Sequence, residues 1–229
     1  MRTLKESILS RSSHGAKGFE AQRREMIERW LKEYKIKNYT INDDYTIDVN
    51  GYVNLVGKDL TEFPEYIQFG VVRGNFNCSG NSLVSLRGCP REVRLGNFLC
   101  NHNQLTSLEG VPKKVDKIFD CSNNELTSLK GVPENVGGSF YCGSNKLTSL
   151  EEAPKKVGGH FGCSHNKLTS LKGAPRKTRV FDCSHNKLTS LKGAPKEVTG
   201  FVCSNNTTTF TVEDIKRVCD IKRDTPLIK

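Results

Sequence analysis

Apolar and polar positions alternate along this chain in a pattern that returns every 20 to 22 residues. The consensus unit is F-x-C-S-x-N-x-L-T-S-L-x-G-x-P-x-x-V, and its Phe, Cys and Asn recur seven times between Phe76 and Asn206. Phe and Cys stand two residues apart, which places both side chains on one face of a short strand. A fixed period of this length is typical of a solenoid, in which each repeat forms one coil and buries apolar side chains against its neighbours.

Two of the copied positions predict ladders of identical side chains inside the solenoid. The aromatic ladder comprises Phe76, Phe98, Phe119, Phe140, Phe161, Phe181 and Phe201. At the second position an amide would satisfy backbone groups at the end of each strand. This ladder comprises Asn81, Asn103, Asn124, Asn145, Asn166, Asn186 and Asn206. We therefore predict a right-handed coil with one parallel sheet, little helix in the repeats, and extended return segments after each Pro.

The residues on either side of the repeats predict caps, because a terminal coil would otherwise expose its core and an unpaired strand. Apolar residues at helical period after Phe19 predict a helix, and Asn50-Gly51 between two apolar runs predicts a hairpin. Thr211 opens a short helix where the repeat pattern fades. The expected organisation is a leader or tail at 1–18 with a linker from Ser10 to Gly18, an N-terminal cap at 19–59, repeats at 60–206 and a C-terminal cap at 207–229.

The copied unit resembles the leucine-rich repeat, L-x-L-x-x-N-x-L-x-x-L, with Phe and Cys in two of the Leu positions. Its length and its Pro-containing return resemble the short repeats of bacterial secreted effectors. The segment from Leu188 to Val198, L-T-S-L-K-G-A-P-K-E-V, is similar to repeats common in tailed-phage and prophage proteins of unassigned function. The resemblance covers residues 60–206 and implies a leucine-rich-repeat solenoid of bacterial or phage type.

The composition narrows the class of protein. The hydrophobic fraction of 35% is low for a compact core but suits a solenoid, which buries a thin line of side chains in each coil. Neither a signal peptide nor a membrane span is apparent, so we expect reduced thiols and a location in the host cytoplasm or a virion. The repeated Cys is interpreted as a small core residue, since no C-x-x-C occurs.

No arrangement of residues typical of catalysis is apparent. The chain has no recognisable triad, phosphate-binding loop or carboxylate pair, so we expect neither an enzyme activity nor a cofactor. His165 and His185 occupy the same position of successive repeats and could stack, but no third ligand is fixed beside them and we expect no metal site. The net charge of +10 leaves nucleic acid open as a partner. However, most repeat lysines fall on the return side, and the rings that could stack on bases are expected inside.

Specificity is expected at strand positions that differ from repeat to repeat and point outward. The candidate binding residues are Leu99, Ile118, Asp120, Tyr141, His160 and Asp182, with Tyr141 as the aromatic anchor. This pattern favours a non-enzymatic module that binds a host or viral protein through its strand face. One alternative is a virion structural or packaged cargo protein, whose residues 1–18 resemble the short charged leaders of some phage proteins. The other is a basic nucleic-acid-binding protein.

Overall fold

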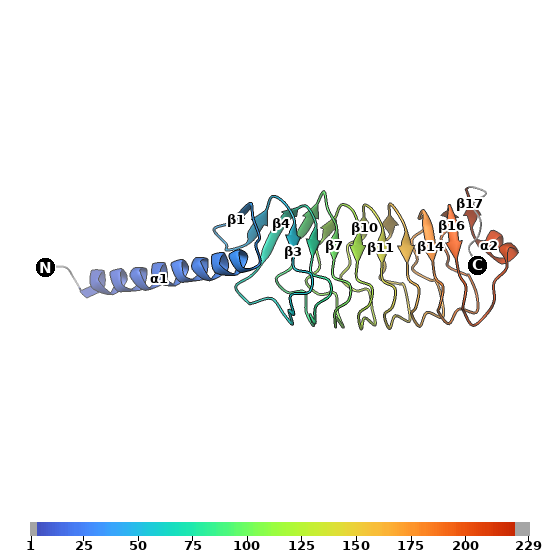
Figure 1. The fold of residues 1–229 in the computed structure, drawn as a ribbon, viewed down its shortest axis with the longest axis horizontal. Coiled ribbons are helices and arrows are strands. Elements are labelled where there is room, and N and C mark those ends of the chain that lie inside the picture. Colours follow the sequence, from blue (N-terminus) through green and yellow to red (C-terminus); the bar gives the residue numbers. More distant parts are fainter. Residues whose placement is uncertain (1–3, 223–229) are drawn as a thin grey trace.

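The computed structural model describes residues 4–222, with side chains for residue 18 and residues 20–222. A long helix, α1 (Leu4–Glu33), leads into a stack of coils, and a short helix, α2 (Val212–Val218), follows the last coil (Figure 1). The coils pass through two sheets in which strands of neighbouring coils run parallel. Residues 4–222 therefore form a parallel-strand β-solenoid of about eight coils with little helix, as the repeat predicted.

The Phe-containing strands form the larger sheet, with one strand from each coil. They pair in register, so that Phe76 lies beside Phe98 and Phe140 lies beside Phe161. A slip of one residue would move every Phe to the outer face, so the buried ladder holds the register. Over the described residues this eight-stranded sheet consists of β3 (Val53–Asn54), β5 (Phe76–Asn77), β7 (Phe98–Leu99), β9 (Phe119–Asp120), β11 (Phe140–Tyr141), β13 (Phe161–Gly162), β14 (Val180–Asp182) and β16 (Gly200–Val202).

A second sheet runs along the return side of the coils, so the prediction of a single sheet was wrong. Val93, Val115 and Val136 pair side by side and are at most 2% exposed. Their burial brings the return segments together, and β-branched Val favours the extended backbone. In the described chain this sheet consists of β1 (Tyr39–Ile41), β2 (Ile47–Val49), β4 (Phe69–Arg73), β6 (Glu92–Arg94), β8 (Lys114–Val115), β10 (Asn135–Val136) and β12 (Lys156–Val157), while β15 (Glu197–Val198) pairs separately with β17 (Asp220–Ile221).

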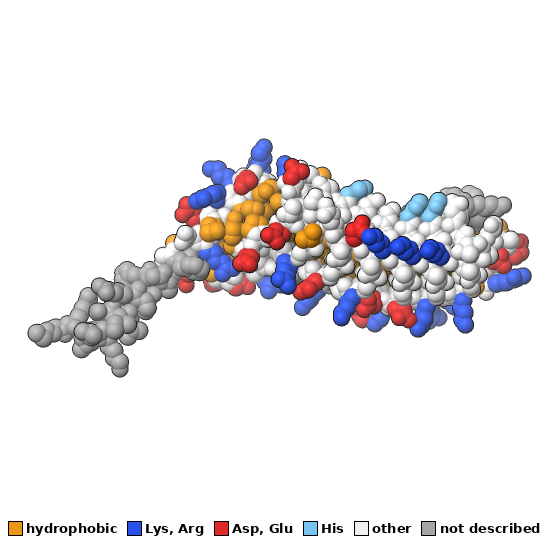
Figure 2. Space-filling view, turned by 90° about the horizontal axis from the view of Figure 1, so that it is seen from below, with side chains coloured by type: hydrophobic (Ala, Val, Ile, Leu, Met, Phe, Trp, Pro, Cys, Tyr) orange, Lys and Arg blue, Asp and Glu red, His pale blue; other side chains and the backbone are white. Residues whose placement is uncertain are grey.

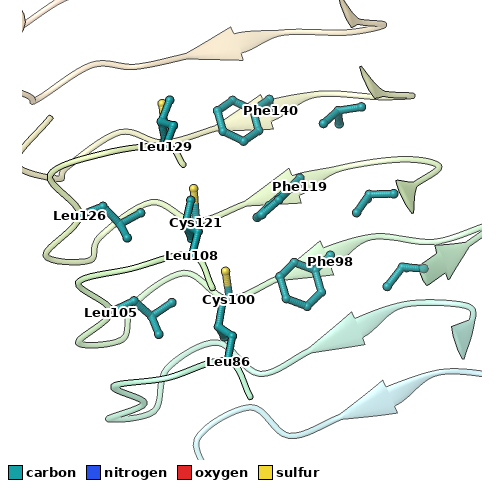
Figure 3. Close-up of a cluster of buried hydrophobic side chains, with 14 of the residues drawn as sticks. Leu86, Phe98, Cys100, Leu105, Leu108, Phe119, Cys121, Leu126, Leu129 and Phe140 are labelled. Carbon is teal, nitrogen blue, oxygen red and sulfur yellow. The ribbon is translucent and has the colours of Figure 1, made fainter. Parts of the chain in front are cut away.

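The interior consists of stacked rows, one for each copied position (Figure 3). Phe98, Phe119 and Phe140 are fully buried, and successive ring centroids along the ladder from Phe76 to Phe201 are 5.2 to 5.8 Å apart. Leu side chains of each unit pack beside the Cys in the same interior (Figure 3). The predicted aromatic ladder is thus confirmed, and burial of each ring stabilises the fold by about 1.5–3 kcal/mol.

The Asn ladder bonds each coil to the preceding one. The Asn145 amide nitrogen donates to the carbonyls of Cys121, Cys142 and Gly143 at 3.0 to 3.2 Å, and its Oδ1 accepts from the Leu126 amide at 3.0 Å. Equivalent bonds are made by Asn103, Asn124, Asn166 and Asn186. These five side chains are 6 to 9% exposed, whereas the two at the ends of the ladder, Asn81 and Asn206, are half-buried. The prediction of a buried ladder is therefore confirmed for its central five members.

The chain between β2 and β3 does not form the hairpin predicted at Asn50-Gly51. Instead, β2 pairs antiparallel with β1, and β3 pairs in parallel with β5 in the other sheet. Val53 takes the position of Phe76 and is 1% exposed, so the first coil begins before residue 60. Asn50-Gly51 lies at the corner between the two sheets, because burial of Val49 and Val53 outweighs the local turn preference.

The helix α1 is longer than the sequence indicated. It begins at Leu4 and continues through Ser10 to Gly18, where a linker was predicted. Its C-terminal end packs on the first coils: Trp30 is 5% exposed, and its ring centroid lies 6.2 Å from those of Phe63 and Phe69. The only Trp of the chain therefore lies against the start of the aromatic core.

The short helix predicted after Thr211 is confirmed as α2. The Thr211 hydroxyl accepts a hydrogen bond from the Asp214 amide, and the Asp214 carboxylate accepts one from the Thr211 amide. These reciprocal bonds satisfy amides that have no partner in the first turn of a helix. Ile215 is 4% exposed, and β17 adds a strand beside β15, so this segment lies against the end of the array.

Candidate binding surface

The outer face of the eight-stranded sheet presents positions that differ from coil to coil. The residues between each Phe and Cys form one row in register, and the residues before each Phe form a second row. The predicted residues fall into these two rows, with Leu99, Asp120, Tyr141 and Asp182 in the first and Ile118 and His160 in the second. All six are half-buried. The structure therefore brings the predicted site residues together on one surface.

The Tyr141 ring lies across the neighbouring coil at Gly162. A Cβ placed on Gly162 would come within 2.9 Å of Tyr141 Cδ1, closer than side chains pack in real proteins. Gly162 is consequently buried although its position faces outward. The middle of the outer face thus carries an aromatic ring held by packing, which suits an anchor because little side-chain freedom remains to be lost on binding.

Two of the predicted acids have a local structural role. Asp120 Oδ1 accepts hydrogen bonds from the amide and hydroxyl of Ser122 at 2.9 and 2.6 Å. Asp182 accepts the same two bonds from Ser184 at 3.0 and 2.6 Å. Such bonds fix the turn that follows a strand. Each carboxylate therefore stabilises the chain reversal through one of its two oxygens.

Tyr52 is a candidate that the sequence interpretation missed. Its side chain is 72% exposed, and it stands directly before Val53, in the same row as Ile118 and His160. The segment Y-V-N-L-V-G at 52–57 aligns with N-F-N-C-S-G at 75–80, with Val and Leu in the Phe and Cys positions. That alignment was the available signal, and the hairpin interpretation concealed it. Tyr52 extends the aromatic character of the outer face to the first coil.

The predicted stacking of His165 and His185 is confirmed. Their ring centroids are 4.0 Å apart with planes 10° from parallel, and the Asn205 amide lies 3.0 Å from His185 Nε2. All three residues have a φ of 52° or 53°, a region in which Asn and His are enriched. Within residues 4–222, no three His, Cys, Asp or Glu side chains gather in a group that could hold a metal ion. Each His of the stacked pair directly precedes the ladder Asn of its coil.

Basic side chains gather on other faces of the solenoid, and Figure 2 shows one line of them running along the coils. Several are paired with acids of a neighbouring coil: Lys155 Nζ and Lys172 Nζ each lie 2.6 Å from an oxygen, of Glu134 and Glu151 respectively. A hydrogen bond from each lysine lowers the pKa of its Glu. Water screens these exposed pairs, so they neutralise charge but contribute little to stability.

Comparisons of the chain with protein-family models, with curated proteins and with solved structures find no match. Neither helix in the described part of the chain has an apolar run that could cross a bilayer. The function of this chain is therefore inferred from the residues of the outer face and their geometry.

Proposed function

We propose that this chain is a leucine-rich-repeat protein that binds another protein through the outer face of its eight-stranded sheet. One observation carries the proposal. Seven coils place the same Phe and Cys in the interior, whereas the residues that point outward differ from coil to coil. A face that only met water could be copied with the rest of the unit. Its variation, together with Tyr52 and Tyr141, favours recognition of a specific partner.

The proposal extends to the ends of the array and to its origin. The helices α1 and α2 serve as caps for the first and last coils, and the burial of Trp30 and Ile215 supports this role. The copied unit favours a protein encoded by a phage or prophage that acts in the host cytoplasm or in the virion. It works by binding, without an enzyme activity or a cofactor of its own.

Replacement of Tyr141 by Ala tests the proposal. A photo-crosslinking amino acid at Asn97, on the outer face, would capture the partner in a host lysate for identification and purification. We expect Tyr141→Ala to weaken affinity about tenfold or more, because the loss of a central aromatic side chain commonly costs 2 kcal/mol or more. Isothermal titration calorimetry with the purified partner measures the change.

Charge reversal on the return side provides the control. Lys113→Glu combined with Lys114→Glu leaves the outer face intact and should change affinity less than about threefold at physiological salt, because exposed charges mainly alter the association rate. The opposite order, with binding abolished by charge reversal and falling steeply with salt, would identify a nucleic-acid ligand and overturn the proposal. Retention of the protein in purified virions, with binding changed by neither Tyr141→Ala nor the charge reversal, would also overturn the proposal and would indicate a structural role.

A further inference from the structure

The return-side sheet is interrupted towards its C-terminal end. β12 is its last strand, and β15 belongs to a separate pair. The return segment between them forms an isolated bridge from Lys177 to Glu197 and rejoins the preceding coil at Gly159. The Gly159 carbonyl accepts hydrogen bonds from Thr178 Oγ1 at 2.6 Å and from the Arg179 amide at 2.8 Å. A groove of about 1060 Å³ opens at this break.

The length of this coil explains the break. Six residues separate Pro154 from Phe161, but only five separate Pro175 from Phe181. The shorter corner has less chain with which to follow β12 before it enters the next Phe-containing strand. The Gly pair that follows β12 is also absent from the shorter corner, which reads R-K-T-R-V. The groove therefore opens where the corner shortens from six residues to five; the following corner, from Pro195 to Phe201, is equally short.

The floor of the groove is apolar. Val157, Val180 and Val202 line it, the first 6% exposed and the other two half-buried. Phe201 also borders the groove, but its ring is 1% exposed, so the half-buried His160 is the one lining ring on which a base could stack. The three Val side chains make the floor suited to aliphatic side chains of a partner.

The rim of the groove is cationic, and part of its charge is uncompensated. Lys155 is paired with Glu134, and Lys177 with Glu197 at 3.1 Å, so these two lysines are already neutralised. Three further cations on the rim have no ion-pair partner among the residues described: Lys156, Arg176 and Arg179. All three are exposed. The groove therefore combines an apolar floor with three unpaired positive charges.

We propose that this groove binds an acidic segment of a partner protein in an extended conformation. Carboxylates of the segment would pair with Lys156, Arg176 and Arg179, since arginine binds carboxylates with two parallel hydrogen bonds. Alternate side chains of an extended peptide point to opposite sides, so apolar residues between the acids would reach the Val floor. The edge of β12 borders the groove and is available to peptide backbone, as in other complexes that extend a sheet. The groove adjoins the outer face of the proposed function, because His160, Val180 and Val202 belong to its two rows and also line the groove, whereas Tyr141 does not.

A synthetic peptide of alternating Glu and Val, labelled with fluorescein, tests this inference by fluorescence polarisation. We expect saturable binding to the full-length protein, and a loss of at least about tenfold in affinity when Lys156→Glu, Arg176→Glu and Arg179→Glu are combined. The matched control combines Lys113→Glu, Lys114→Glu and Lys117→Glu, which makes the same charge change two coils away. The control and Tyr141→Ala should each leave affinity within about twofold of the unchanged protein.

A second variant removes the groove and keeps much of its charge. Replacing R-K-T-R-V at 176–180 by K-K-V-G-G-H, the segment of the preceding coil, restores the missing residue. We expect the sheet to become continuous and peptide binding to be lost while the circular dichroism spectrum is retained. Absence of peptide binding to the unchanged protein, an equal loss in the control triple variant, or full binding by the replaced coil would each overturn the inference. Binding of a single-stranded oligonucleotide that is tighter than binding of the peptide, and is lost in the same groove variants, would also overturn the inference.

Discussion

Phe140→Ala is expected to lower the free energy of unfolding by about 3–5 kcal/mol. The Phe140 side chain is fully buried, and its ring centroid lies 5.5 Å from those of both Phe119 and Phe161. Truncation leaves a cavity in the middle of the ladder, and each neighbouring ring is held in its own coil by strand pairing and cannot fill it. Chemical denaturation followed by circular dichroism measures the loss.

The next residue along the same strand supplies the control. Tyr141 points to the outer face and is half-buried, so Tyr141→Ala should cost about 1 kcal/mol or less. Equal losses for the two substitutions would contradict the assignment of one side chain to the interior and the other to the surface. A small loss also establishes that Tyr141→Ala is folded, which the binding measurement on this variant requires.

Asn145→Leu is expected to lower the free energy of unfolding by about 1–3 kcal/mol. The substitution keeps a buried side chain of similar size but leaves the Leu126 amide without its hydrogen-bond partner. It also removes one hydrogen bond to each of the carbonyls of Cys121, Cys142 and Gly143, which keep bonds from Asn124, Asn166 and Asn123 respectively. The Leu126 amide and the Cys121 carbonyl belong to the preceding coil, so the substitution also removes hydrogen bonds between two coils. A buried polar group without a partner costs about 1–3 kcal/mol, and repacking can recover part of this.

The same chemical change on the surface is the matched control. Asn135 lies in β10 with an exposed side chain, and Asn135→Leu should change stability by about 0.5 kcal/mol or less. Denaturation midpoints of the two variants are compared at equal protein concentration. A midpoint for Asn145→Leu that matches Asn135→Leu would show that the amide ladder does not hold the coils together.

The interior of this protein could be predicted from the sequence because every coil repeats the same packing problem. Phe, Cys, Asn and the Leu pair recur at fixed spacing, and a position that recurs in this way faces the same neighbours in each coil. The predicted Phe ladder and the central part of the Asn ladder follow from that regularity. The outward direction of Tyr141 follows as well, since it alternates with buried Phe140 and Cys142.

The ends and the return side were harder to predict, because they depend on tertiary contacts. The Asn50-Gly51 pair has a strong local preference for a tight turn, but burial of Val49 and Val53 in two different sheets prevails. The second sheet rests on a single buried Val in each return segment, which is too short a signal to distinguish a paired strand from an extended loop. Tyr52 was missed for the same reason, since its coil carries Val and Leu in place of Phe and Cys.

The groove beside β12 shows how a small irregularity in the sequence has a structural consequence. From Cys100 to Cys163, successive Cys of the repeat are 21 residues apart, and from Cys163 to Cys203 they are 20 residues apart. The shortening was visible, but its effect depends on which corner of the coil loses the residue and on how the backbone closes the gap. The resulting break in the sheet places basic residues of two coils around one apolar floor.

The thiols report directly on the interior. All nine Cys are buried and unpaired in the structure. Desolvation raises the pKa of ladder thiols such as Cys100 and Cys121 well above the ordinary value, and it raises the pKa of Cys203 and Cys219 to about 11. Because the thiolate is the reactive form, increasing pH should make Cys203 and Cys219, at the C-terminal end, react before Cys100 and Cys121.

Counting reactive thiols in the folded and the denatured protein tests the division between a copied interior and a varied outer face most directly. In the folded protein at about pH 8, a thiol reagent should modify almost none of the nine Cys, and after denaturation without reductant it should modify nearly all nine. Rapid modification of several Cys in the folded protein would place the copied residues at the surface and contradict the account. A denatured count well below nine would reveal disulfides and contradict it equally.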